Sequence, residues 1–486
     1  MKLYLAGLSS GYEPEHVARL FWPALQLVKE YPAHGQDAIV LHKSGTRVLC
    51  AVRWEKEITA RRFSLTDGAD KKQEEYEICR ELFCMLRQRT GKQPPWGMLT
   101  GVRPVRLVRN LYARGMSEEQ AAQHLQNDCF VSEEKLRLAT RIEKLQRPVL
   151  AQVEPRSFSL YISIPFCPSR CSYCSFVSRT TGESAKLIEP YVTHLCAELR
   201  DIAALVQKLH LKLESIYIGG GTPTAISAQQ LRTLMNTVKE CFNLSSVREY
   251  TAEAGRPDCT TPEKLAVLKE LGATRISINP QTLSDEVLRA IGRRHTAQDV
   301  LDCFDTARKL GHNNINMDLI AGLPLDTVDG FKKSLEGVMT LGPENITVHT
   351  LTLKRASTLV EDHAPDRYGD VVQMLSACAC LDQAGYEPYY MYRQKGTLQN
   401  LENTGYTKPG FAGLYNIYIM EEVHTILSAG AGGSTKLVAP CGHIKRIFNH
   451  KYPLEYLRCY DVVQQRKQGI EDFYGQYVDM DPQTSC

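Results

Sequence analysis

The sequence lacks a long apolar run, a marked excess of one charge, internal repeats and low-complexity segments. Its apolar stretches fall short of the roughly 20 residues that a membrane-spanning helix needs, and its first residues, Met1-Lys-Leu-Tyr-Leu5, do not have the layout of a signal peptide. Lys and Arg total 58 against 55 Asp and Glu, so the overall charge does not indicate nucleic acid or a membrane surface as a partner. We therefore expect a cytoplasmic protein.

The 16 cysteines do not suggest a disulfide framework, because most lie scattered among apolar neighbours in a chain of 486 residues. Such cysteines behave as small apolar side chains in a reducing compartment. Cys167, Cys171 and Cys174 are different, since they fall within eight residues, directly after an apolar β-type run. Thiolates this close together are usually collected by a metal ion or an iron–sulfur cluster.

Two kinds of centre are compatible with this spacing. A structural zinc knuckle would need a fourth ligand, either His194 or a distant cysteine, but zinc sites usually consist of two separated pairs of ligands. An iron–sulfur cluster normally takes four cysteines. With only three thiolates nearby, one position would be completed by something other than protein. The spacing favours the cluster.

Changes in composition divide the chain into four predicted segments. These are a small α/β domain over 1–92, a helical region over 93–155, a barrel over 156–390 and a less regular C-terminal extension over 391–486. The first boundary falls at Gln93-Pro-Pro-Trp-Gly97, a cluster of breaking residues.

Apolar spacing predicts the elements of the first two segments. The first is expected to have strands over 1–8, 38–41 and 47–54 and helices over 13–28 and 71–89. In the second, Ser117 and Ser132 are placed to cap two helices, because acidic residues follow each of them.

From residue 158 onwards, short apolar runs alternate with helical stretches. The predicted strands are 160–165, 215–218, 250–254, 275–279, 314–320 and 345–353, and the predicted helices are 185–209, 227–242, 262–271, 284–310, 326–340 and 368–384. This succession predicts an α/β fold with a parallel sheet and right-handed crossovers, either a complete or a partial TIM-type (β/α)6 barrel. In such folds the chemistry gathers at the C-terminal ends of the strands.

Glycine and polar residues occupy those strand ends. The cysteines follow the first strand, Gly219-Gly-Gly-Thr222 follows the second, Glu253 ends the third, Gln281 follows the fourth, and Asp318 and Thr352 lie near the ends of the fifth and sixth. The glycines allow the backbone to approach a ligand closely. The two carboxylates could bind amine or ribose hydroxyl groups, or each could be solvated at a strand end. A second glycine-rich stretch, 430–434, has no strand-to-helix context, and we expect an ordinary loop there.

Together these motifs resemble the radical S-adenosylmethionine (SAM) enzymes, in the branch of the oxygen-independent coproporphyrinogen III oxidases and haem chaperones. The motifs are Tyr161-x-x-Ile-Pro-Phe-Cys167-x3-Cys171-x-Tyr-Cys174, Gly219-Gly-Gly-Thr-Pro-Thr224, Gln281 with Arg293 twelve residues on, and Asn316-Met-Asp318-Leu-Ile-Ala-Gly-Leu-Pro324. The resemblance covers about 158–355 and extends more loosely to about 435. The long N-terminal part is similar to that of the HemZ-type members, which are named as coproporphyrinogen dehydrogenases.

The resemblance implies a 4Fe-4S cluster on Cys167, Cys171 and Cys174, with an open iron that takes the amino and carboxylate groups of S-adenosylmethionine. It also implies the cofactor contacts: Tyr161 and Tyr173 near the cofactor, Gly220, Gly221 and Thr222 at its methionine end, and Glu253, Gln281, Arg293, Asp318 and Thr352 at its ribose, carboxylate or adenine.

The resemblance further implies an oxidative decarboxylation of a tetrapyrrole. A reduced flavodoxin or ferredoxin-type protein would supply the electron that converts the cofactor to a 5′-deoxyadenosyl radical. This radical would abstract hydrogen from a propionate of coproporphyrinogen III, and loss of carbon dioxide would leave a vinyl group. Two rounds would give protoporphyrinogen IX.

Two positions depart from the decarboxylases and keep alternatives open. Where those enzymes have a cysteine two residues after the third ligand and a histidine two residues after the tyrosine, this chain has Phe176 and Ser163. Both resemble the haem chaperones, which keep the cluster and are not thought to decarboxylate. The chaperone tail has a histidine before asparagine, however, and here Tyr415-Asn416 stands instead. A haem-binding chaperone is therefore a second hypothesis, and a radical enzyme with another substrate is a third.

Overall fold

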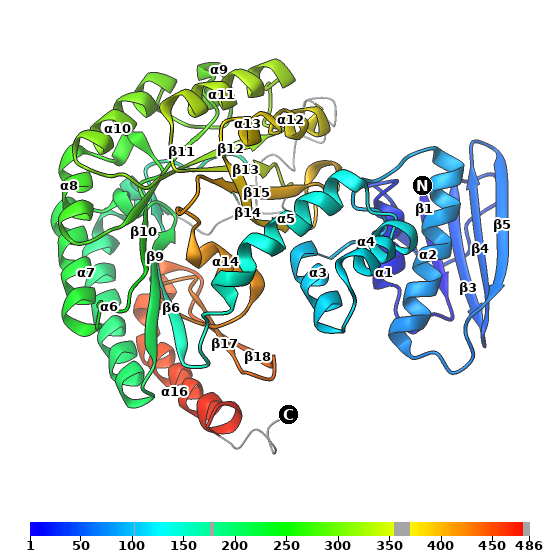
Figure 1. Cartoon of the computed structure of the whole chain (residues 1–486), viewed down its shortest axis with the longest axis horizontal. Coiled ribbons are helices and arrows are strands. Elements are labelled where there is room, and N and C mark those ends of the chain that lie inside the picture. The colour runs from blue at the N-terminus through cyan, green and yellow to red at the C-terminus, as the bar shows by residue number, and fades with distance from the viewer. Residues whose placement is uncertain (102, 175–178, 354–369, 480–486) are drawn as a thin grey trace. The chain divides into compact units, whose positions relative to one another are not determined.

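The computed structural model describes residues 1–101, 103–174, 179–353 and 370–479 (Figure 1). It separates into two compact units, an N-terminal unit of Met1–Arg141 with Gln399–Leu401 and a barrel unit of Ile142–Leu398 with Glu402–Cys486. No helix within the described ranges has both the length and the apolar character needed to cross a bilayer.

The N-terminal unit contains a five-stranded sheet and several helices. Its strands are β1 (Lys2–Ala6), β2 (Gln26–Val28), β3 (Ala38–Ser44), β4 (Arg47–Trp54) and β5 (Glu57–Ser64), and its helices are α1 (Tyr12–Arg19), α2 (Lys71–Thr90), α3 (Pro104–Ala113), α4 (Glu118–Gln123) and the first part of α5 (Glu133–Leu150). The strand order is β2-β1-β3-β4-β5, with β1 parallel to both of its neighbours and β3, β4 and β5 antiparallel. The predicted hairpin, the helix over 71–89 and the cap at Ser117, which accepts a 3.1 Å hydrogen bond from the backbone N–H of Gln120, are confirmed.

Two expectations for this unit are corrected. The predicted helix over 13–28 is wrong in its second half, because α1 ends at Arg19 and β2 forms an edge strand on β1. Pro23, which has no backbone N–H to continue a helix, lies between them. The strand β5 was not predicted, because most of its residues are exposed and its sequence lacks apolar alternation.

The barrel unit is built from strands that alternate with helices. The strands are β6 (Ser157–Ile164), β7 (Phe166–Cys167), β8 (Arg179–Thr180), β9 (Lys212–Gly220), β10 (Glu249–Glu253), β11 (Arg275–Gln281), β12 (Ile315–Ala321), β13 (Asn345–Thr350), β14 (Glu387–Arg393), β15 (Glu402–Thr407), β16 (Thr425–Ala429), β17 (Ser434–Val438) and β18 (Ile444–Phe448). The helices are α6 (Thr181–Lys208), α7 (Ala228–Cys241), α8 (Pro262–Glu270), α9 (Asp285–Ala290), α10 (Ala297–Lys309), α11 (Val328–Leu341), α12 (Val371–Ala377), α13 (Cys380–Gln383), α14 (Leu414–Glu421), α15 (Pro453–Arg458) and α16 (Tyr460–Tyr477).

Six parallel strands, in the order β6-β9-β10-β11-β12-β13, form the centre of an 11-stranded sheet. The helices between them line the outer side of the curved sheet (Figure 1), so these strands are covered by helices on one face and enclose the barrel on the other. Their side chains are accordingly buried on both faces, as in β6, where Leu160 and Ile162 on one face and Ser159 and Ser163 on the other are all buried. The predicted partial α/β barrel is confirmed.

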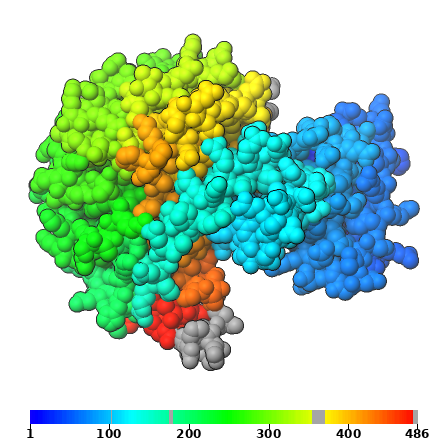
Figure 2. Space-filling model, in the orientation of Figure 1, coloured from blue at the N-terminus to red at the C-terminus, as the bar shows by residue number. Residues whose placement is uncertain are grey.

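The C-terminal residues extend this sheet at both edges. At one edge β15 pairs antiparallel with β13 and then with β14, and at the other β16 pairs parallel with β6 and is followed by β17 and β18. In Figure 2 these residues, orange and red, share the surface of the barrel unit with the green barrel helices. The last strands therefore complete the walls of the barrel.

The predicted helix over 284–310 is divided in two. Helix α9 ends at Ala290 and α10 begins at Ala297, and Gly292 between them has a positive φ of 78°. Glycine adopts this conformation without steric cost. The break carries Arg293 out of any helix, which matters for the site. The predicted helix over 368–384 is likewise divided, into α12 and α13, and its first two residues lie outside the described part of the chain.

Candidate active site

A cavity of about 620 Å³ lies inside the barrel, and every residue predicted for the cluster or the cofactor lines it. These residues are Tyr161, Cys167, Cys171, Tyr173, Cys174, Gly220, Gly221, Thr222, Glu253, Gln281, Arg293, Asp318 and Thr352. They come from six strands and the segments after them, so the parallel sheet is what brings them together. Their individual roles remain predictions.

The segment of the three cysteines is held by backbone hydrogen bonds to two neighbouring elements. Ser172 N–H donates to the carbonyl of Ile291, just after α9, at 3.1 Å, and Cys174 N–H donates to the carbonyl of Cys171 at 3.1 Å. On the other side, Thr222 N–H donates to Phe166 O at 2.8 Å, and its hydroxyl lies 3.5 Å from Cys167 Sγ. The segment is therefore fixed to the loop after β9 and to the end of α9.

The glycine loop packs directly against the cysteine segment. Gly220 has a φ of 112°, in the region that glycine favours. A Cβ atom at Gly221 would lie 2.7 Å from Phe166 O and 3.0 Å from Cys167 Sγ, so no side chain fits there. The glycines therefore let the loop approach the first cysteine, and the predicted close approach to a ligand stays a prediction.

Two predicted cofactor contacts present buried polar atoms without a partner in the described chain. They are Oε1 of Gln281 and Nε of Arg293. Gln281 also has a positive φ of 69° and follows a shift in register between β11 and β12, an irregularity that can re-aim a side chain at a functional site. Buried polar groups normally have partners, so these two atoms suit a bound polar cofactor.

The three thiols do not converge on one point. Within the described residues, no group of three or more His, Cys, Asp or Glu side chains is arranged to hold a single metal ion. His194, the alternative zinc ligand, lies on α6, where its ring packs against Tyr460 at 5.1 Å between centroids, and it does not line the cavity. The structure therefore gives no support to the zinc knuckle with His194. The glycine loop and the unpartnered atoms of Gln281 and Arg293 instead suit a cluster with a bound cofactor.

Arg293 connects the cysteine segment with the strand ends. Its Nη2 donates to the hydroxyl of Tyr173 at 3.1 Å, and its Nη1 donates to the carbonyl of Asn279 at 2.7 Å. After α9 ends, the chain turns at Gly292 and so brings Arg293 to the cavity. If α9 continued as a helix, Arg293 would not lie at this position. The guanidinium is buried and interacts electrostatically with the thiol of Cys171.

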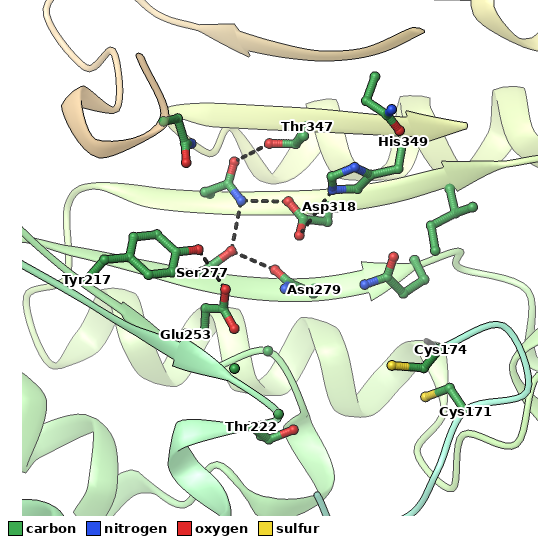
Figure 3. Close-up of a pocket in the computed structure, with 18 of the residues that line it drawn as sticks. Cys171, Cys174, Tyr217, Thr222, Glu253, Ser277, Asn279, Asp318, Thr347 and His349 are labelled. Atoms are coloured by element: carbon green, nitrogen blue, oxygen red, sulfur yellow. Dashed lines mark hydrogen bonds and ion pairs between the residues drawn. The ribbon is translucent and has the colours of Figure 1, made fainter. Parts of the chain in front are cut away.

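Two carboxylates, Glu253 on β10 and Asp318 on β12, lie on either side of β11 (Figure 3) and differ in the direction of their pKa shifts. Tyr217 donates a 2.6 Å hydrogen bond to Glu253 Oε1, but burial dominates and raises the pKa of Glu253 to about 7. Burial also acts against ionisation of Asp318, yet the nearby His349 and a 2.7 Å hydrogen bond from Asn316 lower the pKa of Asp318 below its usual value. Asp318 therefore stays charged at neutral pH, while Glu253 is only partly ionised.

Several residues that line the cavity, among them Tyr217 and His349, were not predicted. The ring of Tyr217 stacks with those of Tyr161, a predicted cofactor contact, and Tyr415, with centroids 4.5 Å apart for Tyr217 and Tyr415. His349 lies 3.6 Å from Asp318 Oδ2 and 3.3 Å from the Tyr392 hydroxyl. Inward alternation along β9 could have indicated Tyr217, which shares a face with Gly219 of the glycine motif, whereas His349 shares a face with Thr347, which was not predicted either.

The expectation that 430–434 is an ordinary loop is wrong. Gly432, Ser434 and Lys436 line the cavity, because this loop joins β16 to β17 at the edge of β6. A Cβ at Gly430 would lie 2.6 Å from Ser163 O, so the glycines permit close packing on β6. The sequence carries a signal for the tight turn, but the pairing of β16 with β6 spans more than 250 residues and has no local signature.

Of the two positions that depart from the decarboxylases, the structure describes Ser163 but not Phe176. Ser163 is buried, donates a 2.8 Å hydrogen bond to the carbonyl of Ala431, and does not line the cavity. Phe176 lies outside the described residues. Tyr415 and Asn416, from the tail comparison, both line the cavity.

The fold and the site define a class of protein. A family model of the radical SAM superfamily matches residues 161–337, which include the three cysteines and the strands from β6 to β12. Among solved structures, coproporphyrinogen III oxidase (HemN) from Escherichia coli, described as a radical SAM enzyme, aligns with a TM-score of 0.52 and 23% identity over 66% of this chain and 73% of that chain. That likeness shows a shared fold.

Two curated relatives define the family. The oxygen-independent coproporphyrinogen-III oxidase-like protein HemZ of Bacillus subtilis is 38% identical over 459 residues, which are 91% of each chain. The haem chaperone HemW of Escherichia coli is 30% identical over 309 residues, 62% of this chain and 75% of that protein. The chain therefore belongs to the radical SAM superfamily and, within it, to the family of these HemZ and HemW proteins. The superfamily uses a 4Fe-4S cluster and S-adenosylmethionine, and these are the cofactors of this chain.

Proposed function

We propose that this protein is a radical SAM enzyme that oxidatively decarboxylates propionate side chains of coproporphyrinogen III to vinyl groups, giving protoporphyrinogen IX without oxygen. The name of the HemZ relative, which aligns over almost its whole length, supports this substrate class. A reduced flavodoxin or ferredoxin-type protein is proposed as the electron donor.

The observation that carries the proposal is the continuity of the cavity. The three cysteines and the glycine loop form one part of its wall, and the same cavity extends past Glu253 and Asp318 to Tyr415 and Arg275. A substrate bound in the second part would lie next to a cofactor bound in the first. Proximity of this kind is what a hydrogen abstraction between two bound molecules requires.

In this proposal Cys167, Cys171 and Cys174 hold the cluster. The predicted contacts Tyr161, Tyr173, Gly220, Gly221, Thr222, Glu253, Gln281, Arg293, Asp318 and Thr352 bind and orient S-adenosylmethionine. When bound, the cluster and S-adenosylmethionine together supply the one-electron chemistry that starts the reaction.

Charged side chains of the cavity suit an anionic substrate. Arg275 is buried, lines the cavity, and lies in the electrostatic field of the carboxylates of Glu249 and Asp318. Its Nε has no hydrogen-bond partner among the described residues, while its Nη2 lies 3.4 Å from the Tyr389 hydroxyl. A buried guanidinium with an N–H group left over can donate to a carboxylate such as a propionate. Glu253, with its pKa near neutrality, can either donate or accept a hydrogen bond to a cofactor hydroxyl.

The test is turnover by the full chain, reconstituted anaerobically with iron and sulfide and given S-adenosylmethionine, a reductant and coproporphyrinogen III. Protoporphyrinogen IX, detected after oxidation to protoporphyrin, and 5′-deoxyadenosine should both accumulate. A Cys171→Ala variant treated in the same way is the matched blank. If 5′-deoxyadenosine forms and no vinyl product appears, decarboxylation is not the function.

A haem-binding chaperone is the second candidate function, and one observation favours it. Position 163, where the decarboxylases have a histidine, holds a small serine that is turned to Ala431 and does not reach the cavity. HemW relatives carry the name haem chaperone. Stoichiometric haem binding in an optical titration, with no turnover in the assay above, would select this function.

A further inference from the structure

Arg256 is a buried cation next to a predicted cluster ligand, and it is not one of the predicted cofactor contacts. It follows β10, is only 4% exposed, and its Nη1 lies 3.5 Å from Sγ of Cys171. The same guanidinium donates to the carbonyl of Ser169 at 3.3 Å and to its hydroxyl at 2.9 Å. Arg256 therefore contacts both the thiol and the backbone of the cysteine segment.

Asp258 holds this arginine in place through two parallel contacts. Arg256 Nε donates to Asp258 Oδ1 at 2.9 Å and Nη2 donates to Oδ2 at 2.7 Å, the bidentate arrangement that fixes a guanidinium most firmly. Burial acts against ionisation of Asp258, but the His295 ring 3.7 Å away and the hydrogen bonds from Arg256 lower its pKa well below the usual value. The pair is therefore charged on both sides at neutral pH.

A second arginine lies close by, but its position differs. Arg293 makes its short contacts to Tyr173 and to the carbonyl of Asn279, and it is a predicted contact of S-adenosylmethionine. Arg293 also interacts electrostatically with the thiol of Cys171, so two buried cations lie near this cluster ligand. Arg256 is the one of the two that is not a predicted contact of the cofactor, and its side chain also holds the base of the loop through Ser169.

We propose that Arg256 is a positioning residue that raises the reduction potential of the cluster bound at Cys171, and that Asp258 limits the size of this increase. The proposal rests on the cluster site of the proposed function. Reduction adds one electron, and hence one negative charge, to the cluster. A buried cation beside a ligand sulfur stabilises the reduced state, and its effect is large where the surrounding dielectric constant is low.

The signs of the expected shifts make the proposal testable. Arg256→Gln removes a positive charge next to Cys171, so the midpoint potential becomes more negative. Asp258→Asn removes the negative charge that partly cancels Arg256, so the potential becomes less negative. For each variant we expect the ratio of reduced to oxidised cluster at a fixed potential to change by about ten-fold, which is equivalent to about 59 mV for a one-electron couple.

The measurement is a redox titration of the reconstituted full chain, followed by electron paramagnetic resonance, with iron and sulfide counted per chain. Arg232→Gln is the matched control, because Arg232 makes a similar bidentate pair with Glu270, at 2.7 Å for both contacts, on the exposed surface. The potential of this variant should equal that of the unaltered chain. If Arg256→Gln loses its cluster, Arg256→Lys is titrated in its place. Lysine keeps the positive charge, so the midpoint potential should stay close to that of the unaltered chain.

Shifts of Arg256→Gln and Asp258→Asn in the same direction, or no shift in either, would overturn the proposal, because a purely structural role predicts no opposed signs. Loss of the cluster in both Arg256→Gln and Arg256→Lys would also overturn it in favour of a structural role. The titration contains no substrate, so a failure of coproporphyrinogen turnover leaves its result unaffected.

Discussion

The hydroxyl of Tyr217 lies 2.6 Å from Oε1 of Glu253, and the two side chains project from neighbouring strands into the barrel. Burial raises the pKa of Glu253 to about 7, even though the hydrogen bond from Tyr217 acts in the opposite direction. The protonated carboxyl is therefore favoured in the folded protein relative to the unfolded chain, where the pKa of the group has its ordinary value of 4.5.

This shift predicts that stability falls as the pH rises from about 5 to 7. In that range the unfolded chain has lost the proton of Glu253 while the folded chain still holds it, so each increase in pH favours unfolding. The full shift corresponds to about 3 kcal/mol. Glu253→Gln should remove this part of the pH dependence, as measured by denaturant unfolding at several pH values.

The exposed Glu263 on α8 provides the control for that measurement. Glu263→Gln should leave the slope of stability against pH unchanged. Equal slopes for Glu253→Gln and the unaltered chain between pH 5 and 7 would show that Glu253 ionises normally in the folded protein.

Each cluster cysteine should be indispensable for iron binding. Changing any one of Cys167, Cys171 or Cys174 to Ala is expected to abolish cluster assembly, because three thiolates leave no spare ligand. Cys303→Ala should leave the iron content unchanged, since Cys303 is a buried side chain of α10 that does not line the cavity. Iron and sulfide analysis after anaerobic reconstitution measures both. Full iron content in any of the first three variants would contradict the site.

Gly221 should control affinity for S-adenosylmethionine. A Cβ there would lie 2.7 Å from Phe166 O and 3.0 Å from Cys167 Sγ, so Gly221→Ala must displace the loop beside the cysteines. We expect affinity to fall by about ten-fold, or about 1.4 kcal/mol, in calorimetric titration of the cluster-loaded protein. Gly182→Ala is the control, because a Cβ at Gly182 meets no atom within 4 Å. Unchanged affinity in Gly221→Ala would place the methionine end elsewhere.

Much of the candidate site follows from the order of strands. Glu253 and Asp318 could be predicted to meet because each lies near the C-terminal end of an apolar run, and parallel strands present those ends at one edge. The same argument predicted that Gln281 and the glycine loop lie at the same end of the barrel as the cysteines. Periodicity and topology, which depend on local sequence, were sufficient for these residues.

Arg256 and Lys436 could not be predicted in this way. Arg256 is 85 residues from Cys171, and their contact depends on the conformation of two loops. Lys436 reaches the cavity because β16 pairs with β6, a contact between distant segments that no periodicity encodes. The break at Gly292 was missed because the apolar spacing continues on both sides of it, although it decides where Arg293 lies.

The C-terminal helix should depend on one buried ion pair. Lys467 of α16 lies 2.8 Å from Oε1 of Glu198 on α6, and both side chains are almost fully buried. Glu198 also accepts hydrogen bonds from the backbone N–H of Gly430 at 2.7 Å and from the Tyr456 hydroxyl at 2.6 Å, so it ties the loop that lines the cavity to α6.

Lys467→Met should therefore destabilise the protein by about 3–5 kcal/mol, because it leaves the buried Glu198 without its counter-ion. Lys208 and Glu471 form an exposed pair between the same two helices, and Lys208→Met should cost less than about 1 kcal/mol. Denaturant unfolding monitored by circular dichroism compares the two variants directly. Similar losses in both would mean that the buried pair contributes no more than the exposed one.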